Sequence, residues 1–451
     1  MTGQGESVPP RPLRPGDVVA AFCEPLGEWA AAQVTALRPD WESAELLELD
    51  WSGPEPAGLA GLGELRPLRK TYGGWGGRLA HCHYDWLLPR NCKVIGNLPV
   101  LVDRPSDSSA LGCWRIGRDL AAQRRWDDRR RGARQPERGD IECTGDELMA
   151  ALSEPGVSLD GVWGLAVKEV TALDCGLLAA RYPALTDLWL AGDMGSLADA
   201  GALNRLGSLK RLSVVGGGLF GMTAADCLLP ERVPALEWLL LHSIPVGYAT
   251  AMRNRWRPLA PDGTCVRISC GRSPQWVAEN RDNPLRCWDG REYITGAQYR
   301  KAVSQYKTTR RAIVAALAEE DTQAVEDRLI QAGREYAEAF NTLGSRTHFI
   351  ETMEREELFD ALEVLVKGLA DHTTLDLAQV IEAVEDGMDQ TRDWLRQPAK
   401  AAAATAPVRT RPQHPAQTPD FLPTRDAISA QVRQRMGRAP VRTVRDQARR
   451  N

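Results

Sequence analysis

Four copies of one short pattern recur between residues 162 and 241, and they constrain the fold more than any other feature of the chain. In each copy apolar residues occupy the first, fourth and sixth positions, and successive copies begin 23, 24 and 27 residues apart. A period of this length predicts a solenoid in which each repeat contributes one short strand and stacks on its neighbours. The copies are Val162-x-x-Leu165-x-Val167, Leu185-x-x-Leu188-x-Leu190, Leu209-x-x-Leu212-x-Val214 and Leu236-x-x-Leu239-x-Leu241.

The pattern is similar to that of leucine-rich repeat proteins, and we interpret residues 141–290 as a short α/β solenoid of that kind. Helical runs such as Leu197–Leu206 would form the convex side, and a degenerate fifth strand is expected at Val266 and Ile268. The leucines would point inward, so the positions between them face outward toward a protein partner. We expect four residues at these positions to contact that partner: Trp189, Lys210, Arg211 and Trp238.

The first part of the chain carries short apolar runs separated by turn signals such as Pro-Leu-Gly and Pro-Asp. Runs of this length and spacing predict a small β-barrel. We place it within residues 14–122, together with a β-rich extension. The expected strands are Asp17–Cys23, Trp29–Leu37, Ala44–Trp51 and Leu65–Leu68.

This segment resembles the Tudor and Agenet group of domains. The likeness rests on the pattern G-D-x-V-x-A, a turn, and W-x-x-A-x-V, carried by Gly16, Asp17, Trp29, Ala32 and Val34. The resemblance implies an SH3-like barrel and, by analogy with Tudor readers, an aromatic cage that holds a methylated side chain. The aromatic residues available for such a cage are Phe22, Trp29 and Trp51, each of which could equally belong to the core.

From Thr295 onward the apolar residues recur at steps of three and four, which predicts α-helices. Three or four helices with narrow apolar stripes suggest a bundle or a coiled-coil association surface. Residues 319–396 carry 20 acidic and 7 basic residues, a net charge of −13, whereas residues 397–451 carry 11 basic and 3 acidic residues, a net charge of +8. The second segment is rich in Pro, Ala and Arg, and it has too few apolar residues to fold alone.

We therefore expect an α+β multidomain protein with a small β-barrel, a short leucine-rich repeat solenoid, a helical bundle and a disordered tail. The order of these parts resembles uncharacterised actinobacterial leucine-rich repeat proteins, a likeness that implies no activity. The expected segments are a disordered N-terminus (1–13), the β domain (14–122), a charged linker (123–140), the repeat domain (141–290), an acidic helical bundle (291–396) and a disordered basic tail (397–451).

Two motifs could carry chemistry. Gly216, Gly218 and Gly221 form a G-x-G-x-x-G directly after an expected strand, as in a dinucleotide-binding fold. The acidic residue that should end the next strand is missing, and the repeat pattern already explains that strand. His81, His83 and Cys92 are the other candidate set, as zinc ligands without a clear fourth member, or as parts of an ordinary strand–turn–strand. We therefore expect no cofactor and no metal.

Nothing in the sequence pairs a nucleophile with a base, so we expect a non-enzymatic scaffold or adaptor that binds a protein partner through the repeat face. One alternative is a nucleic-acid-associated regulator that uses the β-barrel and the basic tail. Another is a nucleotide-binding enzyme built on Gly216–Gly221. Ten cysteines without a C-x-x-C pair, no apolar leader and no membrane-length apolar segment predict a cytoplasmic protein without membrane contact. The C-terminal helices could form a homo-oligomer.

Overall fold

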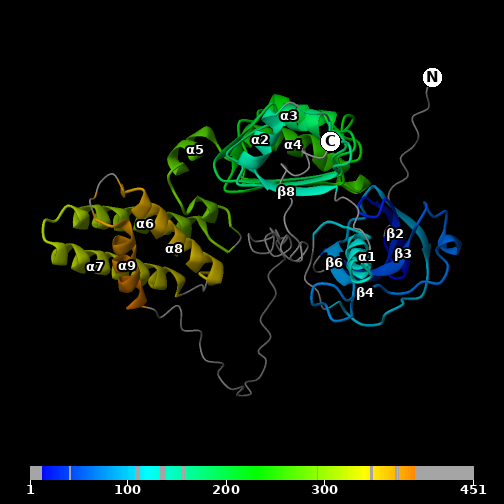
Figure 1. Ribbon diagram of the computed structural model, residues 1–451, viewed down its shortest axis with the longest axis horizontal. Helices are drawn as coiled ribbons and strands as arrows, with labels where there is room; N and C mark the ends of the chain where they lie inside the picture. The colour runs from blue at the N-terminus through cyan, green and yellow to red at the C-terminus, as the bar shows by residue number, and fades with distance from the viewer. Residues whose placement is uncertain are drawn as a thin grey trace, which may run out of the picture. The chain divides into compact units, whose positions relative to one another are not determined.

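The computed structural model describes residues 13–391 except 40–41, 107–111, 133–138, 155, 157, 292, 346–348, 371–372 and 374. The described residues form two compact units, one that ends at Pro274 and one that begins at Gln275. The chain is an α+β multidomain protein with an antiparallel sheet, a parallel α/β region and a set of helices (Figure 1). Residues 1–12 and the expected tail 397–451 lie outside the described part. Within that part, no helix is both long and apolar enough to cross a bilayer.

The N-terminal part of the first unit is a five-stranded antiparallel sheet in the order β6-β3-β2-β1-β7. Its strands have near-continuous apolar runs because both faces of the sheet are covered. Val19, Ala32 and Leu46 pack on one face, and Val18, Ala31 and Leu49 on the other. The strands are β1 (Asp17–Cys23), β2 (Glu28–Arg38), β3 (Ser43–Gly53), β6 (His81–Asp85) and β7 (Cys92–Asn97), beside a small ladder of β4 (Arg69–Lys70) and β5 (Arg78–Leu79).

Two expectations for this region need correction. The run Leu65–Leu68 is not a strand, and its only ladder contact among the described residues is a single bridge between Leu49 and Pro67. The segment 123–140, expected as a charged linker, begins inside helix α1 (Arg118–Arg130) and ends at the start of β8. Gln123 is buried in α1 and bonds Thr71 and Asp127, so the charges of residues 123–130 belong to a packed helix.

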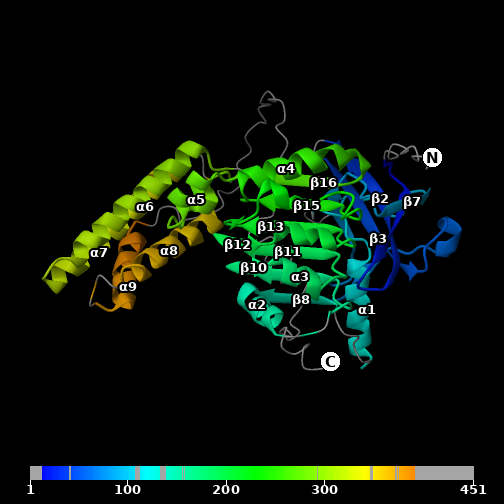
Figure 2. The ribbon, with the colours of Figure 1, turned by 90° about the horizontal axis from the view of Figure 1, so that it is seen from above.

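The parallel region is a six-stranded sheet in the order β16-β15-β13-β11-β9-β8, so the repeats pair in sequence order (Figure 2). Leu165, Leu188, Leu212 and Leu239 lie opposite one another in one buried row, which the partly buried Val266 continues. The degenerate fifth strand is confirmed as β16, whereas β8 was not predicted. The strands are β8 (Asp140–Thr144), β9 (Gly164–Lys168), β11 (Asp187–Gly192), β13 (Arg211–Gly216), β15 (Trp238–His242) and β16 (Cys265–Ser269).

Helices α2 (Gly145–Ser153), α3 (Cys175–Arg181) and α4 (Val246–Trp256) cover one face of this sheet (Figure 1). A second, three-stranded sheet follows the turns, with β10 (Ala172–Asp174), β12 (Gly195–Ala198) and β14 (Leu219–Phe220). The run Leu197–Leu206 is therefore not one helix. Its first two residues are the end of β12, and most of the rest form the 3₁₀ turn η3 (Ala200–Arg205). The other short 3₁₀ turns among the described residues are η2 (Leu59–Leu62), η4 (Ala224–Asp226), η5 (Arg257–Asp262) and η6 (Arg286–Trp288).

The second unit is helical, as the three- and four-residue spacing predicts. Helix α7 contacts both α6 and α9 extensively, and the apolar stripe of α7 is buried at Val325, Leu329 and Tyr336. The backbones of α7 and α9 approach so closely that a Cβ on Gly333 would lie 1.9 Å from the carbonyl oxygen of Val384. The helices are α5 (Pro274–Asn280), which spans the boundary between the units, α6 (Gly296–Leu317), α7 (Thr322–Gly344), α8 (Thr352–Lys367) and α9 (Leu377–Asp389).

Candidate interaction face

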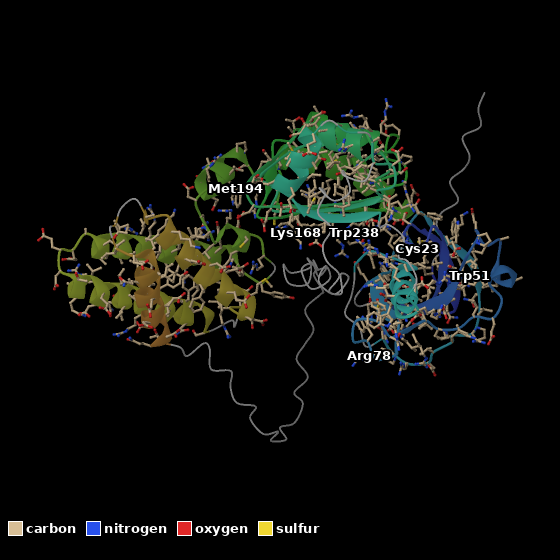
Figure 3. All side chains as sticks on the ribbon, in the orientation of Figure 1. Cys23, Trp51, Arg78, Lys168, Met194 and Trp238 are labelled. Carbon is tan, nitrogen blue, oxygen red and sulfur yellow. The ribbon has the colours of Figure 1, made fainter. Side chains whose placement is uncertain are left out.

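The face of the six-stranded sheet opposite the inward leucines carries two outward rows. Strand alternation places the residues between the leucines on this face. The first row consists of Asp187, Arg211, Trp238 and Cys265, each directly opposite the next. The second row consists of Ala166, Trp189, Ser213, Leu240 and Arg267. Figure 3 labels Lys168 and Trp238, which project on this side of the sheet.

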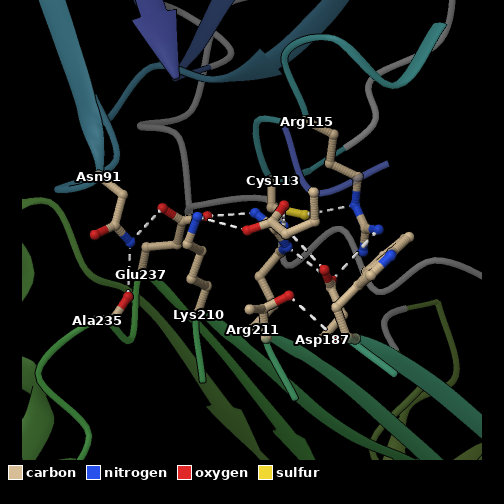
Figure 4. Close-up of polar contacts among 11 residues, drawn as sticks. Asn91, Cys113, Arg115, Asp187, Lys210, Arg211, Ala235 and Glu237 are labelled. Carbon is tan, nitrogen blue, oxygen red and sulfur yellow. Dashed lines mark hydrogen bonds and ion pairs between the residues drawn. The ribbon is translucent and has the colours of Figure 1, made fainter. Parts of the chain in front are cut away.

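Charged side chains of the first row form a buried network with the N-terminal part of the same unit (Figure 4). Arg211 donates two hydrogen bonds to Asp187, from Nε to Oδ1 at 2.7 Å and from Nη2 to Oδ2 at 2.9 Å, and it also pairs with Glu237. Lys210 Nζ lies 2.6 Å from Glu24, which is also 3.7 Å from Arg211. Arg115 lies 3.6 Å from Asp187, so three cations balance three carboxylates.

The opposite charges of this network shift the pKa values of Asp187 and Arg211. Burial alone would raise the pKa of Asp187, but the guanidinium groups of Arg211 and Arg115 hold that pKa well below its ordinary value of 3.8. The same carboxylates raise the pKa of Arg211 despite its burial. Burial lowers the pKa of Arg118 to about 10, with Arg115 adding to the effect, and Arg118 lies over the ring of Trp163.

An apolar cluster lies beside the network. Trp238, Val215, Leu240 and Cys113 are buried together, and Trp189 packs against them while remaining partly exposed. Gly112 has a positive φ of 73° and approaches Trp238 so closely that a Cβ would lie 3.1 Å from the ring. A cavity of about 10 Å³ is lined by Asp85, Cys113, Trp114, Glu237 and Trp238, among others. Such a cavity has room for about one water molecule and none for a substrate.

Further polar contacts extend this interface along the strand ends. Asn91 donates to the carbonyl of Ala235 at 2.7 Å and to Glu237 at 2.9 Å. The backbone N–H of Arg90 donates to the carbonyl of Gly263 at 3.1 Å, and Arg267 pairs with Asp85 at 3.0 Å. The face that the sequence assigns to an external partner is thus contacted by a domain of the same chain, along its first row and at Arg267 of its second row.

The four expected partner residues therefore have different surroundings. Lys210, Arg211 and Trp238 make the intramolecular contacts just described, and the side chains of the two cations are 16% and 11% exposed. Trp189 is in the second row, at the edge of the apolar cluster. Sequence reasoning missed Glu24, Asp187 and Glu237, although Asp187 and Arg211 occupy the same repeat position with opposite charge. That alternation was the available signal for a charged ladder.

Gly216 ends β13, Gly218 lies in the turn between β13 and β14, and Gly221 directly follows β14. Gly216, Gly218 and Gly221 all have positive φ, and the turns after the other strands have left-handed residues at Glu169, Met194, Ser243 and Cys270. The next helical element is the three-residue η4, so no helix N-terminus follows the glycines as a dinucleotide fingerprint requires. A Cβ on Gly216 would lie 2.4 Å from the carbonyl oxygen of Gly192, so the stacking of turns explains this glycine.

The candidate zinc ligands are not brought together. His81 and His83 lie on β6 and Cys92 on β7, at opposite ends of the strand order of the five-stranded sheet. The Nε2 atom of His81 is 2.7 Å from the hydroxyl of Thr35 and 3.6 Å from Glu45. Among the described residues, no group of three or more His, Cys, Asp or Glu side chains could hold a metal ion.

The aromatic residues of the expected cage share one face of the antiparallel sheet. Phe22 lies directly opposite Trp29 across β1 and β2, and Phe22 is 41% exposed. A lysine of the chain already occupies part of this face, because Lys93 Nζ lies 5.0 Å from the ring centre of Trp29 and pairs with Glu55. Lys210 Nζ lies 5.7 Å from the ring centre of Phe22, so Phe22 also adjoins the charged network.

The buried thiols are poor nucleophiles. Burial raises the pKa of Cys23, Cys143, Cys175 and Cys265 to about 12, so these groups stay protonated at neutral pH.

No protein-family model, no curated protein and no solved structure matches the chain.

Proposed function

We propose that this chain is a non-enzymatic interaction protein, built from a Tudor-like barrel and a leucine-rich repeat solenoid, whose strand face recognises protein surfaces. One observation carries the proposal: the outward rows of the parallel strands already bind a folded domain of the same chain, through ion pairs, an anchoring tryptophan and backbone hydrogen bonds. Aromatic and Arg anchors surrounded by polar contacts are what protein-binding faces use.

The in-chain domain leaves a definite place for an external partner. The first row is engaged, and in the second row Arg267 pairs with Asp85 and Leu240 is buried, but Trp189 is partly exposed beside Ser213 and Ala191. Tryptophan contributes a large contact area at low conformational cost and is common at the centre of protein interfaces. In the proposed function, the docked N-terminal domain and the second row form one composite surface, with Trp189 as its external anchor.

The proposal is tested by capture of partners from the native host with the tagged full-length chain, after nuclease treatment, by quantitative mass spectrometry. Trp189→Ala should reduce a specific captured protein at least tenfold, because loss of a central anchor typically weakens binding by about 2 kcal/mol or more. The matched control is Leu177→Ala, which removes an exposed apolar side chain from α3 on the helical side.

Equal capture by Trp189→Ala and the unmodified chain would contradict the proposal. So would the loss of every captured protein after nuclease treatment. Unchanged thermal unfolding of both variants is required before the comparison is made.

A further inference from the structure

Helix α6 has a composition unlike that of the other long helices. Over Gly296–Leu317 it carries five Arg and Lys residues and no Asp or Glu, whereas residues 319–396 have a net charge of −13. All five cations are exposed, and within the described part of the chain none of them forms an ion pair. The cations are Arg300, Lys301, Lys307, Arg310 and Arg311.

Three of these cations form a straight stripe. At 3.6 residues per turn, Arg300, Lys307 and Arg311 point within about 40° of one another around the helix axis. With a rise of 1.5 Å per residue, the stripe is about 16 Å long. In a B-form duplex the phosphates of one strand are spaced 3.4 Å along the axis, so the stripe is as long as about five such phosphates, and it meets fewer phosphates of an extended single strand.

The residues beside the stripe suit a phosphate backbone. Ser304 and Thr308 are exposed next to it and carry hydroxyl donors of the kind that contact phosphates. Ala297 and Ala315 are exposed and small, so a polymer backbone can approach the helix closely. Val314 is the exposed large apolar residue of α6, which is too little apolar surface to anchor the helix in a membrane.

An aromatic side chain stands at the start of α6. Tyr293 is 72% exposed, more than any other large apolar or aromatic side chain in the described residues, and it lies two positions before Thr295, the N-cap of the helix. Exposed aromatic rings next to a basic groove or ridge stack on the bases of single strands. An acidic protein surface could form ion pairs with the cations, but it offers no base on which this ring could stack.

We propose that α6 and Tyr293 form a binding site for single-stranded nucleic acid, in which Arg300, Lys307 and Arg311 contact phosphates and Tyr293 stacks on a base. The site differs from one formed by the β-barrel or the basic tail, and it does not rest on the protein-binding face. Acidic helices elsewhere in the unit weaken non-specific attraction, and Glu319, Glu320 and Asp321 lie past the C-terminal end of the stripe. Binding should therefore be modest and strongly dependent on salt.

The experiment measures fluorescence anisotropy of labelled single-stranded RNA and DNA oligonucleotides with the full chain at several salt concentrations. In the triple variant Arg300→Gln, Lys307→Gln and Arg311→Gln, the slope of log affinity against log salt should fall by about 2, since each phosphate contact contributes about 0.7. That change corresponds to about 100-fold weaker binding at 0.1 M salt if both chains extrapolate to the same affinity at 1 M.

Tyr293→Ala should weaken binding between about 5- and 150-fold while leaving the salt slope unchanged, because stacking releases no counterions. The control for charge is the triple variant Arg328→Gln, Arg334→Gln and Lys367→Gln, which removes three cations of the same unit that already have partners. The control for the aromatic change is Trp86→Ala, whose ring is 41% exposed in the first unit.

The proposal is overturned if the two triple variants have equal slopes, which would assign the phosphate contacts to other cations such as those of 397–451. It is also overturned if no oligonucleotide binds, or if the α6 variant instead loses binding to phosphatidylserine vesicles. Loss of self-association in sedimentation velocity, without an effect on oligonucleotides, would assign the stripe to a second copy of the chain. Because purified components are used, each result is independent of capture through Trp189.

Discussion

At the scale of single residues, Arg211 is the centre of the buried charged network on the face of the parallel sheet. Its guanidinium contacts Asp187, Glu237 and Glu24 in a place where all these side chains are nearly excluded from water. A buried ion that loses its partner costs far more than the intact pair contributes. Arg211, Asp187 and Glu237 all belong to the parallel region, so their pairs stabilise that region, and the Lys210–Glu24 and Arg115–Asp187 pairs add contacts with the N-terminal part.

Arg211→Ala should lower the free energy of unfolding of the first unit by about 3–5 kcal/mol, because Asp187 and Glu237 would remain buried without their partner. Urea denaturation followed by tryptophan fluorescence measures this loss. Arg205→Ala is the matched control, since the Arg205–Asp199 pair is more than half exposed on both sides and should contribute less than about 1 kcal/mol. A loss for Arg211→Ala no larger than the control would show that the network is not buried in solution.

The lowered pKa of Asp187 predicts a dependence of stability on pH. A carboxyl whose pKa is lower in the folded than in the unfolded state stabilises the fold above its ordinary pKa of 3.8, and that contribution is lost as the pH falls below this value. The difference in unfolding free energy between the unmodified chain and Asp187→Asn should therefore be constant from pH 7 to pH 5 and should shrink toward pH 3. Urea titrations at these pH values measure it, and a constant difference down to pH 3 would contradict the prediction.

At the scale of elements, helices α7 and α9 pack through glycines on both sides. A Cβ on Gly387 would lie 1.9 Å from the carbonyl oxygen of Ile330, and Gly333 has the same relation to Val384. These contacts are to backbone, so no side chain can move aside to make room. The narrow apolar stripes of the two helices can then meet at short range, which their sequence periodicity alone does not specify.

Gly333→Ala should destabilise the helical unit by about 1–3 kcal/mol or more, because the helices must separate to accommodate one methyl group. The change is measured as a fall in the Tm of the helical unit by circular dichroism. Gly296→Ala is the control, since its Cβ would meet only Arg300 Nη1, at 3.5 Å, and alanine favours a helix over glycine. Equal melting of Gly333→Ala and the unmodified chain would mean that α7 and α9 are farther apart than described.

At the scale of the whole molecule, the division at Pro274 predicts two unfolding events. The N-terminal sheet and the parallel region share a buried network, so they should unfold together, whereas the helical unit has its own core. In scanning calorimetry, Arg211→Ala should move only one transition and Gly333→Ala only the other. A single transition moved by both variants would show that the two units are coupled.

Sequence periodicity was sufficient to predict the parallel strands of the repeats and the C-terminal helices. Spacings of 23 to 27 residues predicted the parallel strands, and three- and four-residue steps predicted the helices, because burial of one face leaves a regular mark on the chain. Residues 123–130 of the segment expected as a charged linker form part of helix α1. Helix α1 is held by specific polar contacts such as those of Gln123 and by Tyr72 bonding Asp119, and such contacts leave no periodic signal.

The residues of the candidate face could be predicted from the sequence, but their contacts could not. The inward leucines of each strand predict which positions face outward. Trp189, Lys210, Arg211 and Trp238 could therefore be selected from the sequence as residues of this face. The in-chain contacts of this face could not be predicted, because Glu24, Asp85 and Asn91 lie 186, 182 and 146 residues along the chain from their respective partners Lys210, Arg267 and Glu237. The glycine motif is the converse case, since residues that suit a phosphate loop also suit a left-handed turn between stacked strands.

By itself the sequence determined which residues face inward, because the hydrophobic effect acts on every repeat and every helix turn independently of what lies outside it. It also determined the charge of each helix, including the unbalanced cations of α6. Only the tertiary structure decided what covers the outward rows of the sheet. That choice depends on a balance of buried charges and a single close approach between Gly112 and Trp238, and both exist only once distant parts of the chain have met.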